Sequence, residues 1–324
     1  MKIRSSLPGE ERYIASVDLG SHTARLLLCR IVDSPEKIKP VLRKRLYTDL
    51  AKGFSQENAG IISRESINRA LNALKEFSVI SEKYNPEKIL GAATGVFRRA
   101  VNSKELLNLI REKTGISVRI VSGEEEAAIT LKGVVHALGL KEPPCVFFDL
   151  GGSTTEIVFE NNNKTAVMSL PIGAFVLNDR YLRHDPPVSD EIEGLRENVY
   201  RLLSGSIGEW AADNPFIAGS GGTVTSLAAL INDIDKKDLD PELINGVSLN
   251  SNQLLGIYDK LKPLSFRERS ELKSIDEGRA MVILAGTIAV LTIMEYFKSR
   301  CLTVSYSDIL EGLILSYLEG ETYE

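Results

Sequence analysis

The sequence has few residues of the kinds that bind zinc or form disulfide bridges. Of its 324 residues, three are cysteine and three are histidine. Cys29, Cys145 and Cys301 are odd in number, far apart and next to apolar runs, which predicts buried free thiols in a reducing compartment. The histidines have no ligand-like spacing, and this argues against a zinc site.

Long apolar runs and an excess of positive charge are also missing. The longest apolar stretch, residues 280–294, is shorter than the roughly 20 residues that a membrane-spanning helix needs. It predicts a core helix, which we expect to extend over 276–296. Residues 1–12 are polar and do not resemble a signal peptide, so we expect a cytoplasmic protein without a membrane partner. The net charge of -5 argues against a general nucleic-acid-binding protein.

Two glycine-containing turns repeat one pattern in the two halves of the chain. In residues 146–159, two apolar runs flank Asp149-Leu-Gly-Gly-Ser-Thr-Thr155, and in residues 15–28 similar runs flank Asp18-Leu-Gly-Ser-His-Thr23. Glycine permits tight turns, including turns with positive φ, and lets backbone N–H groups approach an anion, while aspartate offers a carboxylate to a hard cation. One such turn is more often an ordinary hairpin. Two copies predict an internal duplication and a clamp for phosphate or a nucleotide.

The length and the ordinary composition, 43% apolar and 26% charged, predict two α/β domains with the ligand in a cleft between them. A third strand over 41–46 and a short strand over 89–93 are expected in the first domain. The second of these delivers Arg98 to its carboxyl end, where ligands bind in open α/β sheets. We expect the first domain to span 1–124 and the second 125–309, with the last helix, about 310–324, packing back on the first domain.

Two further motifs lie at predicted helix starts. In Ser122-Gly-Glu-Glu-Glu-Ala127, Ser122 and Glu125 fit a capping box and the macrodipole accounts for Glu124, but the cap does not require Glu126. Residues 216–218 lead into Gly219-Ser-Gly-Gly-Thr223. The backbone amides of such a turn suit a phosphate or a nucleoside, although close packing of a helix on the sheet explains the glycines equally well.

Together these motifs resemble those of the exopolyphosphatase and guanosine pentaphosphate phosphohydrolase (Ppx/GppA) family, in the actin, sugar-kinase and Hsp70 superfamily. The resemblance covers nearly the whole chain, in the short, two-domain form of the family. It implies two actin-like, ribonuclease H-like domains. Besides the two turns, the acidic motif and the glycine-rich helix start, the matching segments are Leu170-Pro-Ile-Gly-Ala174, Asp185-Pro-Pro187 and Arg279-Ala280.

The resemblance implies a phosphohydrolase that uses Mg²⁺ and water to release terminal phosphate from inorganic polyphosphate or from pppGpp. Glu126 would then be the general base, and Asp18, Asp149 and Glu156 would bind the metal. The oligomeric state stays open, with a homodimer as one alternative. The phosphate-binding residues expected from the turns and the resemblance are Gly20, Ser21, Thr23, Arg25, Arg98, Gly151, Gly152, Ser153, Thr154, Gly221, Gly222 and Thr223.

Some positions depart from the usual family pattern. His22 and Thr154 are unusual residues in the two turns. Ser153 stands where the family usually has glycine, Met281 and Tyr306 where it usually has aspartate, and Leu310 where it usually has arginine. These departures keep a second hypothesis open, a catalytically weak sensor of (p)ppGpp or nucleotide with the same fold. A phosphotransferase of the sugar- or acetate-kinase kind is a third, but the acidic motif favours water as the acceptor.

Overall fold

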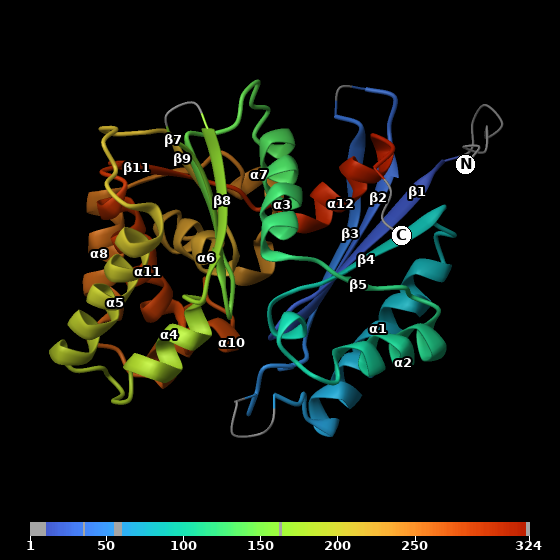
Figure 1. The fold of residues 1–324 in the computed structure, drawn as a ribbon, viewed down its shortest axis with the longest axis horizontal. Coiled ribbons are helices and arrows are strands. Elements are labelled where there is room, and N and C mark those ends of the chain that lie inside the picture. Colours follow the sequence, from blue (N-terminus) through green and yellow to red (C-terminus); the bar gives the residue numbers. More distant parts are fainter. Residues whose placement is uncertain (1–10, 35, 55–59, 162–163, 322–324) are drawn as a thin grey trace. The chain divides into compact units, whose positions relative to one another are not determined.

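The computed structural model describes residues 11–34, 36–54, 60–161 and 164–321. They form two compact units (Figure 1). One unit contains the described residues up to Val121 and those from Leu313 onward, and the other consists of Ser122–Gly312. Each unit has one mixed β-sheet with helices packed on it, which confirms the α/β prediction.

The first unit has a five-stranded sheet in the order β3-β2-β1-β4-β5. The pairs β1/β2 and β2/β3 are antiparallel, whereas β1/β4 and β4/β5 are parallel. Leu74 and Phe77 of α1 and Leu106 and Ile110 of α2 join the buried core of this unit, so both helices are amphipathic as their apolar spacing predicts. The elements are β1 (Tyr13–Leu19), β2 (Thr23–Ile31), β3 (Ile38–Tyr47), α1 (Arg64–Glu82), β4 (Lys88–Ala93), η1 (Gly95–Arg98), α2 (Ser103–Thr114) and β5 (Arg119–Ile120).

The second unit has a six-stranded sheet in the order β10-β11-β9-β6-β7-β8. Strands β6, β9 and β11 are parallel, whereas β7 and β8 continue from β6 as antiparallel neighbours. The last helix, α12, begins in this unit and leads the chain back into the first one at Leu313. The elements are α3 (Gly123–Ala137), β6 (Val146–Leu150), β7 (Thr155–Asn161), β8 (Lys164–Leu170), α4 (Ala174–Tyr181), α5 (Ser189–Ile207), β9 (Ile217–Ser220), α6 (Gly222–Ile231), η2 (Lys236–Asp238), α7 (Pro241–Ile244), β10 (Ser248–Asn250), α8 (Ser251–Leu261), α9 (Phe266–Ser270), α10 (Glu277–Ala280), α11 (Ile283–Tyr296), β11 (Cys301–Val304) and α12 (Ile309–Leu318).

The two sheets share one arrangement. The first strand of each sheet, β1 or β6, has an antiparallel hairpin on one side and a parallel strand, β4 or β9, on the other. This shared topology confirms the internal duplication that the two turns predict. In each unit the turn follows the carboxyl end of the first strand, the edge of an open sheet where ligands bind.

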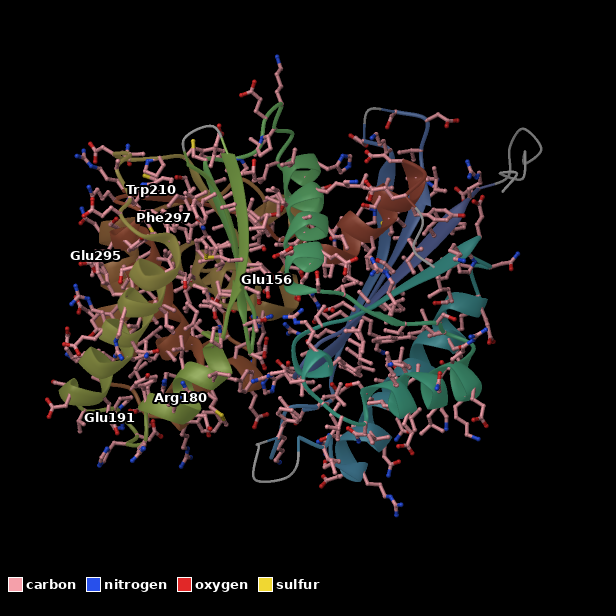
Figure 2. All side chains as sticks on the ribbon, in the orientation of Figure 1. Glu156, Arg180, Glu191, Trp210, Glu295 and Phe297 are labelled. Carbon is pink, nitrogen blue, oxygen red and sulfur yellow. The ribbon has the colours of Figure 1, made fainter. Side chains whose placement is uncertain are left out.

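The core of the second unit is built around α11, which packs against α4, α5, α6 and α8. Twelve of its residues are buried, as expected for a core helix. At its carboxyl end, Phe297 meets Trp210 edge to face, with ring centroids 4.9 Å apart and an interplanar angle of 85° (Figure 2). In the part of the chain that the structure describes, no helix has both the length and the hydropathy to span a membrane.

The structure corrects two expectations. The single helix expected over 276–296 is two helices, α10 and α11, joined by a turn at Met281 and Val282, because Val282 (φ -107°, ψ -8°) stays in the right-handed region but departs from regular α-helical angles. Buried thiols are wrong for Cys145 and Cys301, which are free but exposed, whereas Cys29 is buried. Cys145 directly precedes β6 and Cys301 begins β11, so both lie at strand ends, outside the buried part of the apolar run. Residues 322–324 of the expected last helix lie outside the described residues.

Candidate functional site

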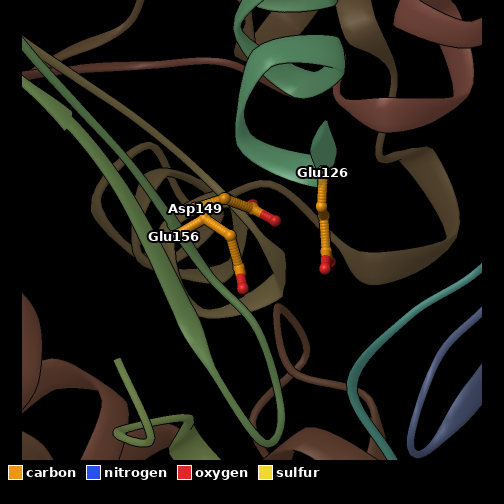
Figure 3. A group of neighbouring side chains, drawn as sticks. All are labelled: Glu126, Asp149 and Glu156. Atoms are coloured by element: carbon orange, nitrogen blue, oxygen red, sulfur yellow. The ribbon is translucent and has the colours of Figure 1, made fainter. Parts of the chain in front are cut away.

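Three carboxylates meet in the second unit. Glu126 comes from the first turns of α3, Asp149 from the end of β6 and Glu156 from the start of β7. One carboxylate oxygen from each lies within 4.8 Å of the others (Figure 3). Glu156 is 1% exposed and Glu126 is 8% exposed, so these two charges are largely withdrawn from solvent, whereas Asp149 is half-buried. Buried carboxylates in such proximity are expected at metal or catalytic sites rather than on an ordinary protein surface.

The sheet register brings two of these carboxylates together. Asp149 and Glu156 are direct cross-strand partners, so their side chains leave the same face of the sheet. The row continues on both sides, because Ser220 of β9 is the partner of Asp149 and Ser169 of β8 is the partner of Glu156. Ser220 Oγ donates to Asp149 Oδ1 at 2.6 Å, and Ser169 Oγ donates to Glu156 Oε1 at 2.7 Å.

The capping box at the start of α3 uses Glu125 but not Glu126. The Glu125 N–H donates to Ser122 Oγ at 3.1 Å and the Ser122 N–H donates to Glu125 Oε2 at 2.8 Å, which confirms the predicted cap. Glu124 and Glu125 are exposed. Glu126, which the cap does not use, is the acidic residue of this turn that is buried beside Asp149 and Glu156.

The second glycine-rich turn is held from behind by the start of α4. The N–H groups of Gly173, Ala174 and Phe175 donate to the carbonyls of Ser153, Gly151 and Gly152, at 3.2, 2.9 and 2.9 Å. In a trans peptide the carbonyl of one residue and the N–H of the next point in opposite directions. The N–H groups of residues 152–154 therefore point away from α4, in the arrangement that an anion-binding turn needs.

Glycine is needed at position 151 for space rather than for backbone conformation. Neither Gly151 nor Gly152 has a positive φ. What requires glycine at 151 is close approach, because a Cβ there would lie 2.9 Å from the carbonyl oxygen of Thr154. Gly151 N–H also donates to this same oxygen, at 3.0 Å, which closes the turn.

The third turn, Gly221 to Thr223, lies next to the second within this unit. Gly221 packs against the carbonyl of Leu150 at the end of β6, and α6 begins at Gly222. The guanidinium of Arg279 occupies the space that a side chain at position 222 would take. The predicted glycine-rich helix start therefore has a cation packed on it, and Thr223 is 4% exposed beside it.

The first unit holds the other predicted residues. Asp18 is 4% exposed and accepts hydrogen bonds at Oδ2 from Arg25 Nε and Nη2, at 2.9 and 2.7 Å. The Gly20 N–H donates to the Thr23 carbonyl at 2.9 Å, which closes the first turn. Ser21 Oγ accepts from the Val96 N–H at 3.0 Å, so this hydroxyl braces the segment that leads to Arg98.

The three-carboxylate site fits a hard divalent cation, because carboxylate oxygens are the donors that Mg²⁺ and Mn²⁺ prefer. Two unit charges 4.8 Å apart repel by on the order of 3 kcal/mol at an effective dielectric constant of about 20. A divalent cation among these oxygens would turn that repulsion into attraction. Sequence reasoning found all three carboxylates but missed Ser169 and Ser220, whose contacts depend on the strand register.

A protein-family model matches the chain over residues 29–321, and it describes the Ppx/GppA phosphatase family. Exopolyphosphatase 2 of Mycobacterium tuberculosis strain H37Rv is 28% identical over 315 residues, which are 94% of this chain and 98% of that protein. The crystal structure of the Aquifex aeolicus Ppx/GppA family member is 30% identical, with a TM-score of 0.81, and covers 97% of this chain and 100% of that one.

The fold is also shared with an exopolyphosphatase from Cytophaga hutchinsonii. That structure has a TM-score of 0.85 at 24% identity and covers 96% of this chain and 99% of that one. These likenesses confirm the predicted fold class, two α/β domains of the actin-like type.

Proposed function

Because the chain belongs to the Ppx/GppA phosphatase family, we propose that it releases terminal phosphate from inorganic polyphosphate, or from pppGpp, by attack of water. The observation that carries this proposal is the convergence of Glu126, Asp149 and Glu156 within 4.8 Å. Relatives named exopolyphosphatase support polyphosphate as the substrate class.

Glu126 is the proposed general base. One of its carboxylate oxygens accepts a proton from water as the water oxygen bonds to the terminal phosphorus and the bridging P–O bond breaks. The shortened chain leaves with the bridging oxygen. Phosphoryl transfer depends mostly on positioning and charge neutralisation, and a base placed beside the attacking water contributes about 10²- to 10⁴-fold to such a step.

Asp149 and Glu156 would hold Mg²⁺, which when bound neutralises phosphate charge. The outward amides of residues 152–154, with the hydroxyls of Ser153 and Thr154, are proposed to bind phosphate oxygens in the second unit. Gly221, Gly222 and Thr223 are proposed to do the same at the start of α6, where Arg279 adds a positive charge.

In the first unit, Gly20, Ser21 and Thr23 are the proposed phosphate-binding turn, together with Arg25 and Arg98. Asp18 is proposed to orient metal and phosphate through Arg25, because its carboxylate already holds that guanidinium. Such a fixed guanidinium is suited to a phosphate, since its planar fork of N–H donors keeps a defined direction. The cytoplasm is the proposed location, supported by free thiols at all three cysteines.

The test is orthophosphate release by the purified protein with Mg²⁺ from long polyphosphate, short polyphosphate and pppGpp, measured for the wild type and for Glu126→Gln. We expect kcat to fall about 10²- to 10⁴-fold in Glu126→Gln, with a much smaller change in KM. Glu124→Gln is the matched control, because Glu124 lies in the same helical turn but is exposed. We expect wild-type activity from it.

Comparable turnover by Glu126→Gln would remove Glu126 from the mechanism. Release from none of the three substrates, with binding retained in calorimetry, would identify the protein as the (p)ppGpp or nucleotide sensor instead. The ranking of the substrates by kcat/KM separates polyphosphate from pppGpp.

A further inference from the structure

Two serines flank the carboxylates of Asp149 and Glu156 in a single row of the sheet. The row runs across four neighbouring strands in the order Ser220, Asp149, Glu156 and Ser169. Each serine hydroxyl donates to the carboxylate next to it, at 2.6 and 2.7 Å. These are short, charge-assisted hydrogen bonds, about twice as strong as those between neutral groups.

The position of these hydrogen bonds matters because Asp149 and Glu156 lie directly opposite each other. Like charges at opposed cross-strand positions repel, and the two side chains would otherwise turn apart. A hydroxyl has one proton and therefore holds one carboxylate oxygen. Ser220 holds the Asp149 carboxylate from the β9 side, and Ser169 holds the Glu156 carboxylate from the β8 side. The two serines therefore stand at the two ends of the row and keep the carboxylates between them in place.

Ser169 has a second contact, with the helix that carries Glu126. A Cβ on Gly123 would overlap the side chain of Ser169, so the first residue of α3 packs directly on this serine. Glu126 follows three residues later in the same helix. Ser169 thus touches both Glu156 and the helix start that places Glu126.

We propose that Ser169 and Ser220 are positioning residues that hold the carboxylates of Glu156 and Asp149 in place for a divalent cation. Ser169 also fixes the spacing between these carboxylates and Glu126. This portion of the proposal rests on the proposed function, in which Glu126 is the general base. Groups that hydrogen-bond metal-binding carboxylates typically change metal affinity by about 10- to 100-fold when they are removed. We expect a loss in that range for Ser169→Ala and for Ser220→Ala.

Metal binding is tested directly, without substrate. Mn²⁺ serves as a paramagnetic probe for a site that takes Mg²⁺, and electron paramagnetic resonance measures free Mn²⁺ in titrations of the full chain. Ser299→Ala is the matched control, because Ser299 is also buried and its hydroxyl lies within hydrogen-bonding distance of two backbone carbonyls, those of Pro215 and Cys301, rather than of a carboxylate. It should bind Mn²⁺ as the wild type does. Ser169→Thr, which keeps the hydroxyl, should recover most of the affinity that Ser169→Ala loses.

Circular dichroism and the melting temperature show that each variant is folded. Mn²⁺ affinity of both alanine variants within twofold of the wild type would overturn the proposal, as would a wild type that binds no Mn²⁺. Affinity lost equally in Ser299→Ala would overturn it as well, because the effect would then be a general loss of stability.

Failure of the proposed function has a different signature. If the wild type binds Mn²⁺ and the serine variants weaken it, but no phosphate is released from any substrate, the positioning role stands and the phosphohydrolase proposal falls. If phosphate is released and Ser169→Ala and Ser220→Ala leave both Mn²⁺ affinity and the Mg²⁺ concentration for half-maximal activity unchanged, the positioning role falls alone.

Discussion

A methyl group added at Gly173 should displace the second glycine-rich turn, Gly151–Thr154, which is the proposed phosphate-binding turn of the second unit, without touching the carboxylates. Gly173 has φ -71° and ψ 156°, an extended conformation that alanine adopts freely, so the substitution introduces no backbone strain. Its new Cβ, however, would overlap the carbonyl group of Gly152 and the amide nitrogen of Ser153. These are backbone atoms of the turn, so no flexible side chain can move aside.

The size of the displacement follows from the contact. The Cβ would lie inside 2.5 Å of these atoms, whereas ordinary van der Waals contact begins at 3.4 Å, so the turn and Gly173 must separate by about 1 Å. A shift of that size in groups that position a substrate can lower the rate about 10²-fold. This corresponds to about 2.7 kcal/mol in transition-state stabilisation. We expect a fall of this size in kcat/KM for orthophosphate release.

Gly256→Ala is the control for Gly173→Ala. A Cβ on Gly256, in α8, meets no atom within 4 Å, and alanine favours a helix over glycine by roughly 0.5–1 kcal/mol. Its activity should equal that of the wild type, and its melting temperature should not fall. Wild-type kcat/KM for Gly173→Ala, in a protein that melts at the wild-type temperature, would refute the claim that this contact positions the turn.

Three further predictions concern stability and the metal. Phe297→Ala removes a fully buried ring that packs against Trp210 and should lower the free energy of unfolding by about 3–5 kcal/mol in urea titrations; a loss below about 1 kcal/mol would contradict the packing. Burial raises the pKa of Glu191, but hydrogen bonds from His184 and from three backbone N–H groups outweigh it and lower the pKa below the ordinary value of 4.5. Its stabilising effect is present above pH 4.5 and is lost as the pH falls through the lower folded pKa, so Glu191→Gln should melt earlier than the wild type at pH 7 and equally at strongly acid pH. Removal of divalent cations with EDTA should abolish orthophosphate release and Mg²⁺ should restore it; activity that survives EDTA would exclude the metal role of Asp149 and Glu156.

Local sequence signals predicted the features that depend on neighbouring residues. The cap at Ser122 and the strands on either side of the Asp149 turn each need only a short stretch of chain, and the structure has both of them. Glu126 emerged for the same reason. The cap accounts for Glu125 and the macrodipole for Glu124, so Glu126 remains as the carboxylate of this motif that helix capping does not explain.

Features that depend on register or tertiary contact could not be predicted this way. Ser169 reaches Glu156 only because β8 pairs with β7 in one particular register, and a shift by one residue would move this hydroxyl to the other face. The break between α10 and α11 carries no proline or glycine at Met281 or Val282, so composition does not mark it. Exposure of Cys145 depends on where β6 begins, and element boundaries are the least certain part of a sequence-based prediction.

The geometry around Ser153 bears on the choice between enzyme and sensor. A serine at a position where the family usually has glycine could have distorted the turn. Ser153 has no positive φ, however, and its carbonyl accepts a hydrogen bond from the Gly173 N–H, just as the two preceding carbonyls of the turn accept from Ala174 and Phe175. The side chain is 5% exposed, so it fits within the packed unit. The turn thus keeps amides that point away from α4, and the three carboxylates are in place beside it. Ser153 thus leaves both the amides of the turn and the three carboxylates in place, so the structure favours the phosphohydrolase over the sensor. Any effect of Ser153 should lie in substrate preference, measured as the ratio of kcat/KM values for two substrates.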